Sequence, residues 1–235
     1  MQYKLYRAGL SGVLLVLADQ VTPGLSQQLR QLREYLLEQL ADIQPQLTPS
    51  YTSLLLEYDL LQTDHQSLLD RLETLLVDWL PPPSTLQDAP LVQLPVFYDP
   101  QVGPDLQRVA SACNLSIDEV IQLHSSLDYE VCALGFAPGF AYLSLTPPAL
   151  SMPRLGQPRA VVPAGSVALA DRQTAVYPQD TPGGWNLLGR TPVKLFDRMR
   201  DSPSLLQPGQ RVQFVPIDQA EFLRLGGSLT QVQQP

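Results

Sequence analysis

The sequence is short of the residues that build metal sites, disulfide frameworks and nucleic-acid surfaces. Its 235 residues include two cysteines, two histidines and 16% charged residues. Cys113 and Cys132 fit neither a disulfide framework nor a zinc spacing, and two histidines without a carboxylate pattern predict no metal site. The net charge is -8 and only two residues are lysines, Lys4 and Lys194. Since such a surface repels a phosphate backbone, we expect no nucleic-acid partner.

Long apolar runs and nucleotide motifs are also missing. The apolar run at residues 13–18 is too short for the core of a signal peptide, and no run approaches the roughly 18 apolar residues of a membrane helix. We interpret this run as a buried strand and expect a soluble cytoplasmic protein without a membrane partner. No G-x-x-x-x-G-K-[ST] loop occurs, and no G-x-G-x-x-G follows a strand.

What the chain does contain first predicts an α/β module. Hydrophobic residues make up 44% of the sequence, which is enough for a core. Residues 3–9 alternate in hydrophobicity and residues 51–59 are rich in β-formers, so both predict strands. One helix is expected to start at Thr22-Pro23 and to stop before Pro45 and Pro49. Asp64 is a candidate cap for a second helix.

From about residue 95 the pattern changes. Two short helices are predicted at residues 104–113 and 117–125, the second with a capping box formed by Ser116 and Glu119. The pair imitates a helix-turn-helix, but its second helix offers acidic side chains and no Arg or Lys, so we interpret it as structural. The short β-rich runs after Tyr129 predict a small barrel or closed sheet. We place the domains at residues 1–94 and 95–235 and expect a frayed tail from residue 226.

Two segments combine Gly, Pro and aromatic residues with almost no charge. They are "GFAPGFAY" at 135–142 and "YPQDTPGGWNLLGRTP" at 177–192. Glycine permits positive φ and close approach of a ligand or another backbone. The segments are therefore either ligand-facing loops or tight corners plugged by aromatic rings. On the first interpretation Phe136, Gly139, Tyr142 and Trp185 contact a ligand.

Polar candidates surround these segments. Arg154 and Arg159 can each clamp a carboxylate or phosphate, although surface arginines in a Pro-rich connector explain them equally well. Ser166 lacks a nucleophile elbow, and His124 is the only well-placed base. His124 ends a helix whose C-terminus favours the protonated ring, so it is a base, a ligand-binding group or a satisfied helix-end histidine. The remaining polar and aromatic candidates suit a pocket wall or a protein interface; they are Gln173, Tyr177, Asn186 and Arg190.

The motifs "LPVFYD", "LGFAPGFAYL", "VPAGSV" and "PGGWNLLGRTP", in this order, resemble the KipI/PxpB family, also called allophanate hydrolase subunit 1. The resemblance runs from the start of the chain to about residue 217. It implies an α+β protein with a small N-terminal α/β sandwich domain and a C-terminal cyclophilin-like β-barrel. Ser144 and Ala168 stand where the family tends to have glycine, which affects ligand geometry and not the fold.

The resemblance also implies a function. Family members are the B subunit of a bacterial ATP-dependent 5-oxoprolinase, which opens 5-oxo-L-proline to L-glutamate together with separate C and A subunits, of which C is the larger. ATP is expected in the complex and no metal in this chain. Two alternatives stay open, a KipI-like inhibitor of a sensor histidine kinase and a subunit of a biotin-linked carboxylase or allophanate hydrolase system. Prolyl isomerisation rests on the fold alone.

The resemblance and the residue patterns together lead to three expectations. The chain alone should be inactive, and an apolar surface should surround Phe136, Phe140 and Trp185. His124, Arg154 and Arg190 should converge on one pocket at the barrel rim as the catalytic residues, facing an anionic ligand. The expected substrate contacts are Phe136, Gly139, Tyr142, Arg159, Ser166, Gln173, Trp185 and Asn186.

Overall fold

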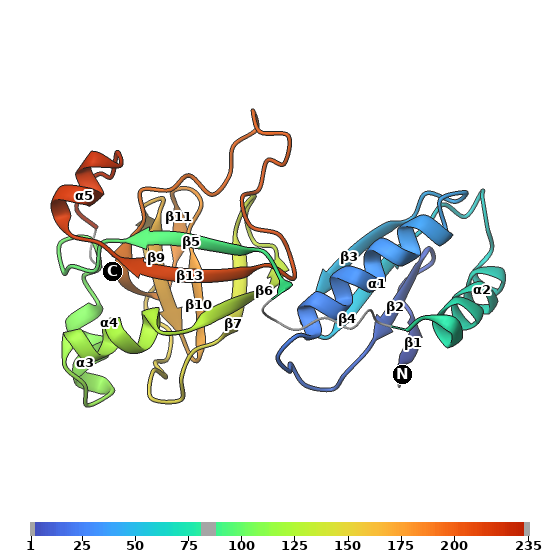
Figure 1. Ribbon diagram of the computed structural model, residues 1–235, viewed down its shortest axis with the longest axis horizontal. Coiled ribbons are helices and arrows are strands. Elements are labelled where there is room, and N and C mark those ends of the chain that lie inside the picture. Colours follow the sequence, from blue (N-terminus) through green and yellow to red (C-terminus); the bar gives the residue numbers. More distant parts are fainter. Residues whose placement is uncertain (1–2, 81–87, 233–235) are drawn as a thin grey trace. The chain divides into compact units, whose positions relative to one another are not determined.

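The protein is represented by a computed structural model that describes residues 3–80 and 88–232 (Figure 1). Its contacts divide the chain into two compact units, Met1–Pro90 and Leu91–Pro235. The strand Leu91–Val96, which directly follows this division, therefore lies entirely in the second unit. Helices and strands are mixed in the chain, and most strand pairs are antiparallel.

The first unit is an antiparallel sheet covered by two helices. The strands pair in the order β1 (Lys4–Arg7), β2 (Gly12–Val16), β4 (Ser53–Glu57) and β3 (Gln46–Ser50). The helices are α1 (Leu25–Gln39) and α2 (His65–Asp78). Leucines at helical spacing bury one face of each helix in a common core with the sheet, among them Leu29, Leu32, Leu68 and Leu72. The amphipathic periodicity thus predicts this unit's architecture.

Local sequence signals in this unit are confirmed only in part. Asp64 caps α2 as predicted, because its carboxylate accepts a hydrogen bond from the Ser67 amide at 3.0 Å. Helix α1 begins at Leu25, after Gly24 with φ 83°, and not at Thr22. Strand β3 is not expected from the sequence, because Pro45 and Pro49 are interpreted only as the end of the preceding helix. Proline nevertheless fits a strand wherever the ladder does not need its missing N–H.

The second unit contains a long path of paired strands. In spatial order these are β5 (Leu91–Val96), β13 (Arg211–Pro216), β6 (Asp128–Leu134), β7 (Ala141–Leu145), β10 (Gln173–Val176), β9 (Ser166–Ala170) and β12 (Asn186–Arg190). Only the β5–β13 pair is parallel among the strands described. Strands β8 (Arg159–Val162) and β11 (Thr181–Gly183) form a separate ribbon. The helices are α3 (Leu106–Ala112), α4 (Ile117–Ser125) and α5 (Gln219–Arg224).

The two ends of this path meet at one bridge. Phe97, next after β5, and Arg190, the last residue of β12, exchange two backbone hydrogen bonds of 2.9 Å. Gly189 permits the approach, since a Cβ there would lie 2.5 Å from the Phe97 carbonyl oxygen. The ends therefore join at a single bridge and not along a paired strand. A cyclophilin-like barrel stays a prediction.

The helices α3 and α4 confirm the local prediction. The Ser116 hydroxyl accepts from the Glu119 amide, and the Glu119 carboxylate accepts from the Ser116 amide, which completes the capping box. Helix α3 packs against β12 and α4 against β13. Together they cover the main hydrophobic core of the unit, to which α3 contributes Leu106 and α4 contributes Val120.

Candidate functional site

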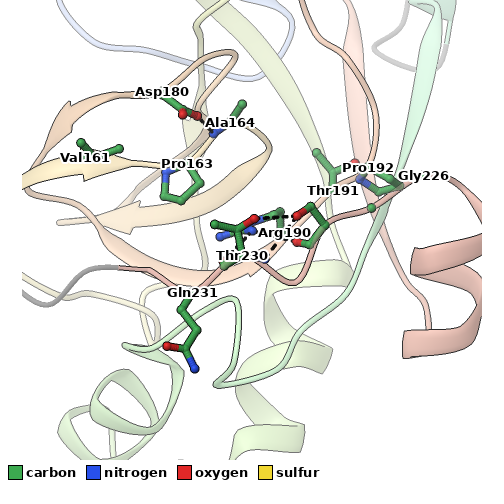
Figure 2. A pocket seen from close by; sticks show the side chains of 12 residues that line it. Val161, Pro163, Ala164, Asp180, Arg190, Thr191, Pro192, Gly226, Thr230 and Gln231 are labelled. Atoms are coloured by element: carbon green, nitrogen blue, oxygen red, sulfur yellow. Dashed lines mark hydrogen bonds between the residues drawn. The ribbon is translucent and has the colours of Figure 1, made fainter.

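Arg190 lies in a pocket at the end of β12 (Figure 2). The pocket measures about 380 Å³, within the size range of small-molecule sites. Its wall combines the turn at Pro163–Ala164, Asp180 and the C-terminal segment 226–231. The Arg190 side chain is only 3% exposed, so the pocket carries a buried cation.

One of the three guanidinium nitrogens of Arg190 forms hydrogen bonds within the described chain, and the other two do not. Its Nη1 donates to the carbonyl oxygens of Ser228 at 2.8 Å and Thr230 at 3.0 Å. Its Nε and Nη2 are buried and have no hydrogen-bond partner within the described residues. Burial lowers the pKa of Arg190, and the nearby Asp180 carboxylate opposes that shift. A buried charge with two unsatisfied donors is costly unless something else binds there.

Ser166 is the partner of Arg190 across the sheet. The two residues are directly paired in the antiparallel β9–β12 ladder, so their side chains emerge on the same face. The Ser166 hydroxyl is buried and has no hydrogen-bond partner in the described part of the chain. Ser166 and Arg190 were both expected in the site, and the register brings them together.

Residues 226–232 make contacts with the rest of the unit, contrary to the expectation of a frayed tail from residue 226; the last three residues of that tail, 233–235, lie outside the described residues. Besides the two carbonyls held by Arg190, Leu229 packs on the cluster of Phe97 and Phe222, and Val232 packs on the cluster that contains Phe140. The sequence of this segment has few apolar residues, so the signal for order was absent. Its position is fixed by the hydrogen bonds from Arg190, which lies 38 residues before Ser228 in the sequence.

The Gly- and Pro-rich segments build an aromatic cluster of Phe136, Phe140, Tyr142, Tyr177 and Trp185. Its rings meet mostly edge to face, with centroid distances from 4.9 to 6.3 Å. Burial raises the pKa of the Tyr177 phenol to about 12, so this ring stays neutral. The interpretation as corners plugged by aromatic rings therefore describes most of this cluster.

Only one of the three aromatics expected at the surface is exposed. Phe136 is 64% exposed, whereas Phe140 and Trp185 are buried. Phe136 has φ 68°, an unusual conformation for a bulky residue. Gly139 in the same turn has φ 82°, and a Cβ there would lie 2.7 Å from Phe196 Cβ. The turn thus presents one phenyl ring to solvent.

Arg154 lies over this cluster. Its Cζ is 5.7 Å from the centroid of the Trp185 ring, a cation–π distance. Arg154 is exposed and does not line the Arg190 pocket. It is therefore an accessible side chain of the aromatic cluster and does not belong to the Arg190 pocket.

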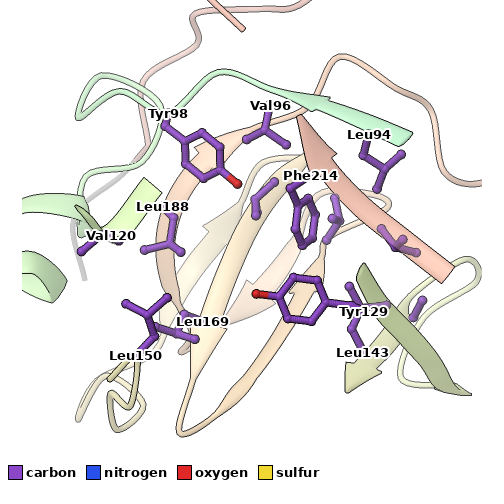
Figure 3. Close-up of a cluster of buried hydrophobic side chains, with 14 of the residues drawn as sticks. Leu94, Val96, Tyr98, Val120, Tyr129, Leu143, Leu150, Leu169, Leu188 and Phe214 are labelled. Atoms are coloured by element: carbon purple, nitrogen blue, oxygen red, sulfur yellow. The ribbon is translucent and has the colours of Figure 1, made fainter. Parts of the chain in front are cut away.

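His124 is fully buried in the core and cannot face a pocket, contrary to the expectation of a rim base. It lies among Tyr98, Tyr129 and Phe214, which are drawn in Figure 3, and stacks on Phe214 with a centroid distance of 4.6 Å. Burial lowers its pKa to about 3, the opposite of the shift expected from the helix end. Desolvation of the charged ring outweighs the helix C-terminus.

The hydrogen bonds of His124 fix its tautomer. The Thr174 hydroxyl donates to the Ala168 carbonyl oxygen at 3.0 Å, so it accepts from His124 Nε2 at 2.8 Å. Nδ1 then accepts from the Tyr98 hydroxyl at 2.7 Å. His124 is a neutral, fully satisfied core histidine. No sequence pattern indicated Tyr98 and Thr174 as its partners.

The polar side chains of Arg159 and Asn186 form their interactions within the chain. Arg159 is buried and its two terminal nitrogens contact the two carboxylate oxygens of Asp105 at 2.9 and 3.0 Å. Asp105 also accepts from the Leu187 amide at 2.8 Å. Asn186 accepts from Arg108 and donates to two backbone carbonyl oxygens. These expected substrate contacts instead tie the start of α3 to β12.

The expected convergence of His124, Arg154 and Arg190 is therefore wrong. His124 lies in the core, Arg154 lies over the Trp185 ring, and Arg190 lies in the pocket that residues 226–231 help to line. Gln173 starts β10, where it pairs with Ala170 and Leu145 and is half-buried. Catalytic and substrate-binding roles of these residues stay predictions. Within residues 3–80 and 88–232, no group of three or more His, Cys, Asp or Glu is placed to hold a metal ion, and no helix is long and apolar enough to cross a membrane.

A family model described as carboxyltransferase domain, subdomain C and D, matches residues 3–206. A curated relative from Escherichia coli O157:H7, named as the B subunit of 5-oxoprolinase, is 46% identical over 157 residues, which are 67% of this chain and 72% of the relative. The Bacillus subtilis (strain 168) protein of the same name is 46% identical over 132 residues, 56% of this chain and 55% of that protein.

Solved structures are also similar to this chain. TTHA0988 superposes with a TM-score of 0.75 at 39% identity, over 88% of this chain and 40% of its own. PH0987 from Pyrococcus horikoshii gives 0.57 at 35% identity, over 93% of this chain and 100% of its own. The K. lactis urea amidolyase gives 0.71 at 17% identity, over 94% of this chain and 15% of its own, and shows a shared fold alone. This chain thus spans only part of most of these relatives.

Proposed function

This chain belongs to the PxpB family of 5-oxoprolinase B subunits, and we propose from that membership that it is a non-autonomous subunit of an ATP-dependent 5-oxoprolinase. The observation that carries the proposal is the 46% identity to the Escherichia coli B subunit over 67% of this chain. The complex would open 5-oxo-L-proline to L-glutamate, with a larger C and a separate A subunit as partners. The second unit of this chain would be a cyclophilin-like barrel.

The chemistry explains why several chains would be needed. Water attacks a lactam carbonyl slowly, so the reaction needs activation, which ATP supplies when it is bound in the complex. Cationic side chains stabilise the charge that develops on the reacting oxygens. This sequence has no phosphate loop, so we assign no nucleotide site to it.

The placement of the candidate side chains supports a shared site. His124 is neutral and fully hydrogen-bonded in the core and Arg159 is paired with Asp105, so both side chains already have partners within this chain. Arg154 and Arg190 are the two expected catalytic residues that face accessible space or a pocket. A partner chain would supply the remaining groups. Phe136 and Arg154 are both exposed side chains of the aromatic cluster, and an exposed apolar ring suits the seam with that partner.

The test is reconstitution. The purified chain alone should show no ATP hydrolysis that depends on 5-oxoproline, and co-expression with candidate C and A subunits should produce it together with L-glutamate. Arg154→Gln should lower this activity in the complex, whereas Arg198→Gln, at another exposed arginine of the same unit, should not. Turnover by the chain alone, or a stable complex of all three subunits without turnover, would contradict the proposal.

A further inference from the structure

The free edge of Arg190 is a binding surface without an occupant inside the described chain. Nε and Nη2 lie on one edge of the planar guanidinium, the edge that binds both oxygens of a carboxylate or phosphate. Neither atom has a hydrogen-bond partner among the described residues, although both are buried. Nη1 is already held by the Ser228 and Thr230 carbonyls, so the tail fixes the direction of the remaining edge.

Ser166, the cross-strand partner of Arg190, adds a third unsatisfied polar atom. Its side chain is on the same face as that of Arg190, and its buried hydroxyl has no hydrogen-bond partner in the part of the chain that the structure describes. A hydroxyl can donate one further hydrogen bond to an oxyanion that Arg190 already holds. Ser166 and Arg190 are paired across the two strands and together carry three unpaired buried polar atoms, and Arg190 lines a pocket of about 380 Å³; this combination indicates a ligand site and not a packing defect.

One acidic side chain also lines the pocket, but it does not occupy the free edge of Arg190. The acidic side chain that lines it, Asp180, is exposed, and its carboxylate accepts from the Ala164 amide at 2.8 Å. Asp180 thus leaves the Nε–Nη2 edge of Arg190 unpaired. No hydrogen bond links the two side chains among the residues that the structure describes.

We propose that Arg190 and Ser166 form a binding site for a small oxyanion of the carboxylate or phosphate class, closed by the C-terminal segment 226–231. Both free nitrogens lie below the surface, so the anion enters when this segment shifts away from the pocket. The site stands on these two residues and on the pocket, and it does not depend on the proposed enzymatic role. It would accept a substrate carboxylate or free phosphate by the same contacts.

The test measures binding to the purified chain by calorimetry and thermal unfolding. The probes are acetate, L-5-oxoproline and inorganic phosphate, each compared with chloride at equal ionic strength. The neutral lactam 2-pyrrolidinone is the control for 5-oxoproline without its carboxylate. Saturable binding of at least one oxyanion, and none of 2-pyrrolidinone, is expected; the probe that binds identifies the source of the oxyanion.

Two variants locate the site. Arg190→Gln should weaken oxyanion binding about 30-fold or more, as for loss of a buried bidentate pair. Ser166→Ala should weaken it about 2- to 10-fold, the value of one hydrogen bond. Ser166→Ala should leave the melting temperature unchanged or higher, because this hydroxyl has no partner to lose within the described residues. Arg198→Gln, at an exposed arginine outside the pocket, should bind like the wild type.

The proposal fails if no oxyanion binds the wild-type chain beyond the effect of chloride. It also fails if Ser166→Ala binds the oxyanion as tightly as the wild type. This comparison remains possible even if Arg190→Gln detaches the C-terminal segment and unfolds the protein. Failure here would leave the reconstitution result unaffected, because this experiment contains neither ATP nor the partner subunits.

Discussion

Acidification should destabilise the second unit because His124 must stay neutral there. Its pKa is lowered from 6.5 to about 3 by burial. Between these values the unfolded chain binds a proton that the folded chain does not, so the free energy of unfolding falls as the pH falls. Each pH unit costs up to about 1.4 kcal/mol, so the loss from pH 6.5 to 5 is roughly 2 kcal/mol and the total down to pH 3 roughly 5 kcal/mol.

The assay is urea unfolding at several pH values from about 7.5 to 5. The chain has two tryptophans, Trp79 in the first unit and Trp185 in the second. In a Trp79→Phe background, fluorescence therefore reports the second unit alone. The other histidine, His65, lies in the first unit. The carboxylates whose pKa values are lowered titrate below this range.

His124→Gln separates this effect from general acid sensitivity. The variant should be less stable at pH 7.5 by about 1–3 kcal/mol, because one of the hydrogen bonds to Tyr98 and Thr174 is lost. Its stability should then change far less between pH 7.5 and 5 than that of the wild type. A flat wild-type profile, or equal slopes in both proteins, would refute the assignment of a buried neutral histidine.

Two further substitutions test the tight contacts between α3, β5 and β12. Asp105→Ala should cost roughly 3–5 kcal/mol in urea unfolding, because it leaves the buried Arg159 without its carboxylate; Asp105→Ala combined with Arg159→Met should recover part of that loss, and no recovery would speak against a charge penalty. Gly189→Ala should lower the melting temperature, because the new Cβ would lie 2.5 Å from the Phe97 carbonyl oxygen, whereas Gly156→Ala, with nothing within 4 Å of the new Cβ, should not.

Elements with a local signal were predictable from the sequence. The capping box at Ser116 and the Asp64 cap each act within one helical turn, and both are present. The leucine periodicity of α1 and α2 is likewise a local pattern. Strand β3 was not predicted, because its proline, Pro49, indicates the end of the preceding helix and not part of a strand.

The site depended on contacts that no local pattern encodes. Asp105 and Arg159 are separated by 54 residues, and Arg190 and Thr230 by 40. Arg159 and Arg190 were both predicted to bind a ligand, yet only the register of β12 and the path of the tail decide which has a free edge. For His124 the sequence indicated the helix end and not the aromatic core around it. Burial is a tertiary property, and here it reverses the sign of the pKa shift.

Phe136 offers a test of strain at the proposed subunit seam. A phenylalanine at φ 68° and 64% exposed is unfavourable in the free chain. Its aromatic contact with Phe140, at a centroid distance of 5.2 Å, contributes about 0.5–1.5 kcal/mol.

Asparagine tolerates this backbone conformation, so Phe136→Asn should change the stability of the isolated chain by no more than about 1 kcal/mol. If the exposed ring is retained for the partner, Phe136→Asn should weaken assembly with the larger C subunit in gel filtration. Met199→Asn, at another exposed apolar side chain of the same unit, should not. Unchanged assembly of the Phe136 variant would remove this turn from the seam, and a large loss of stability would make the ring a core residue instead.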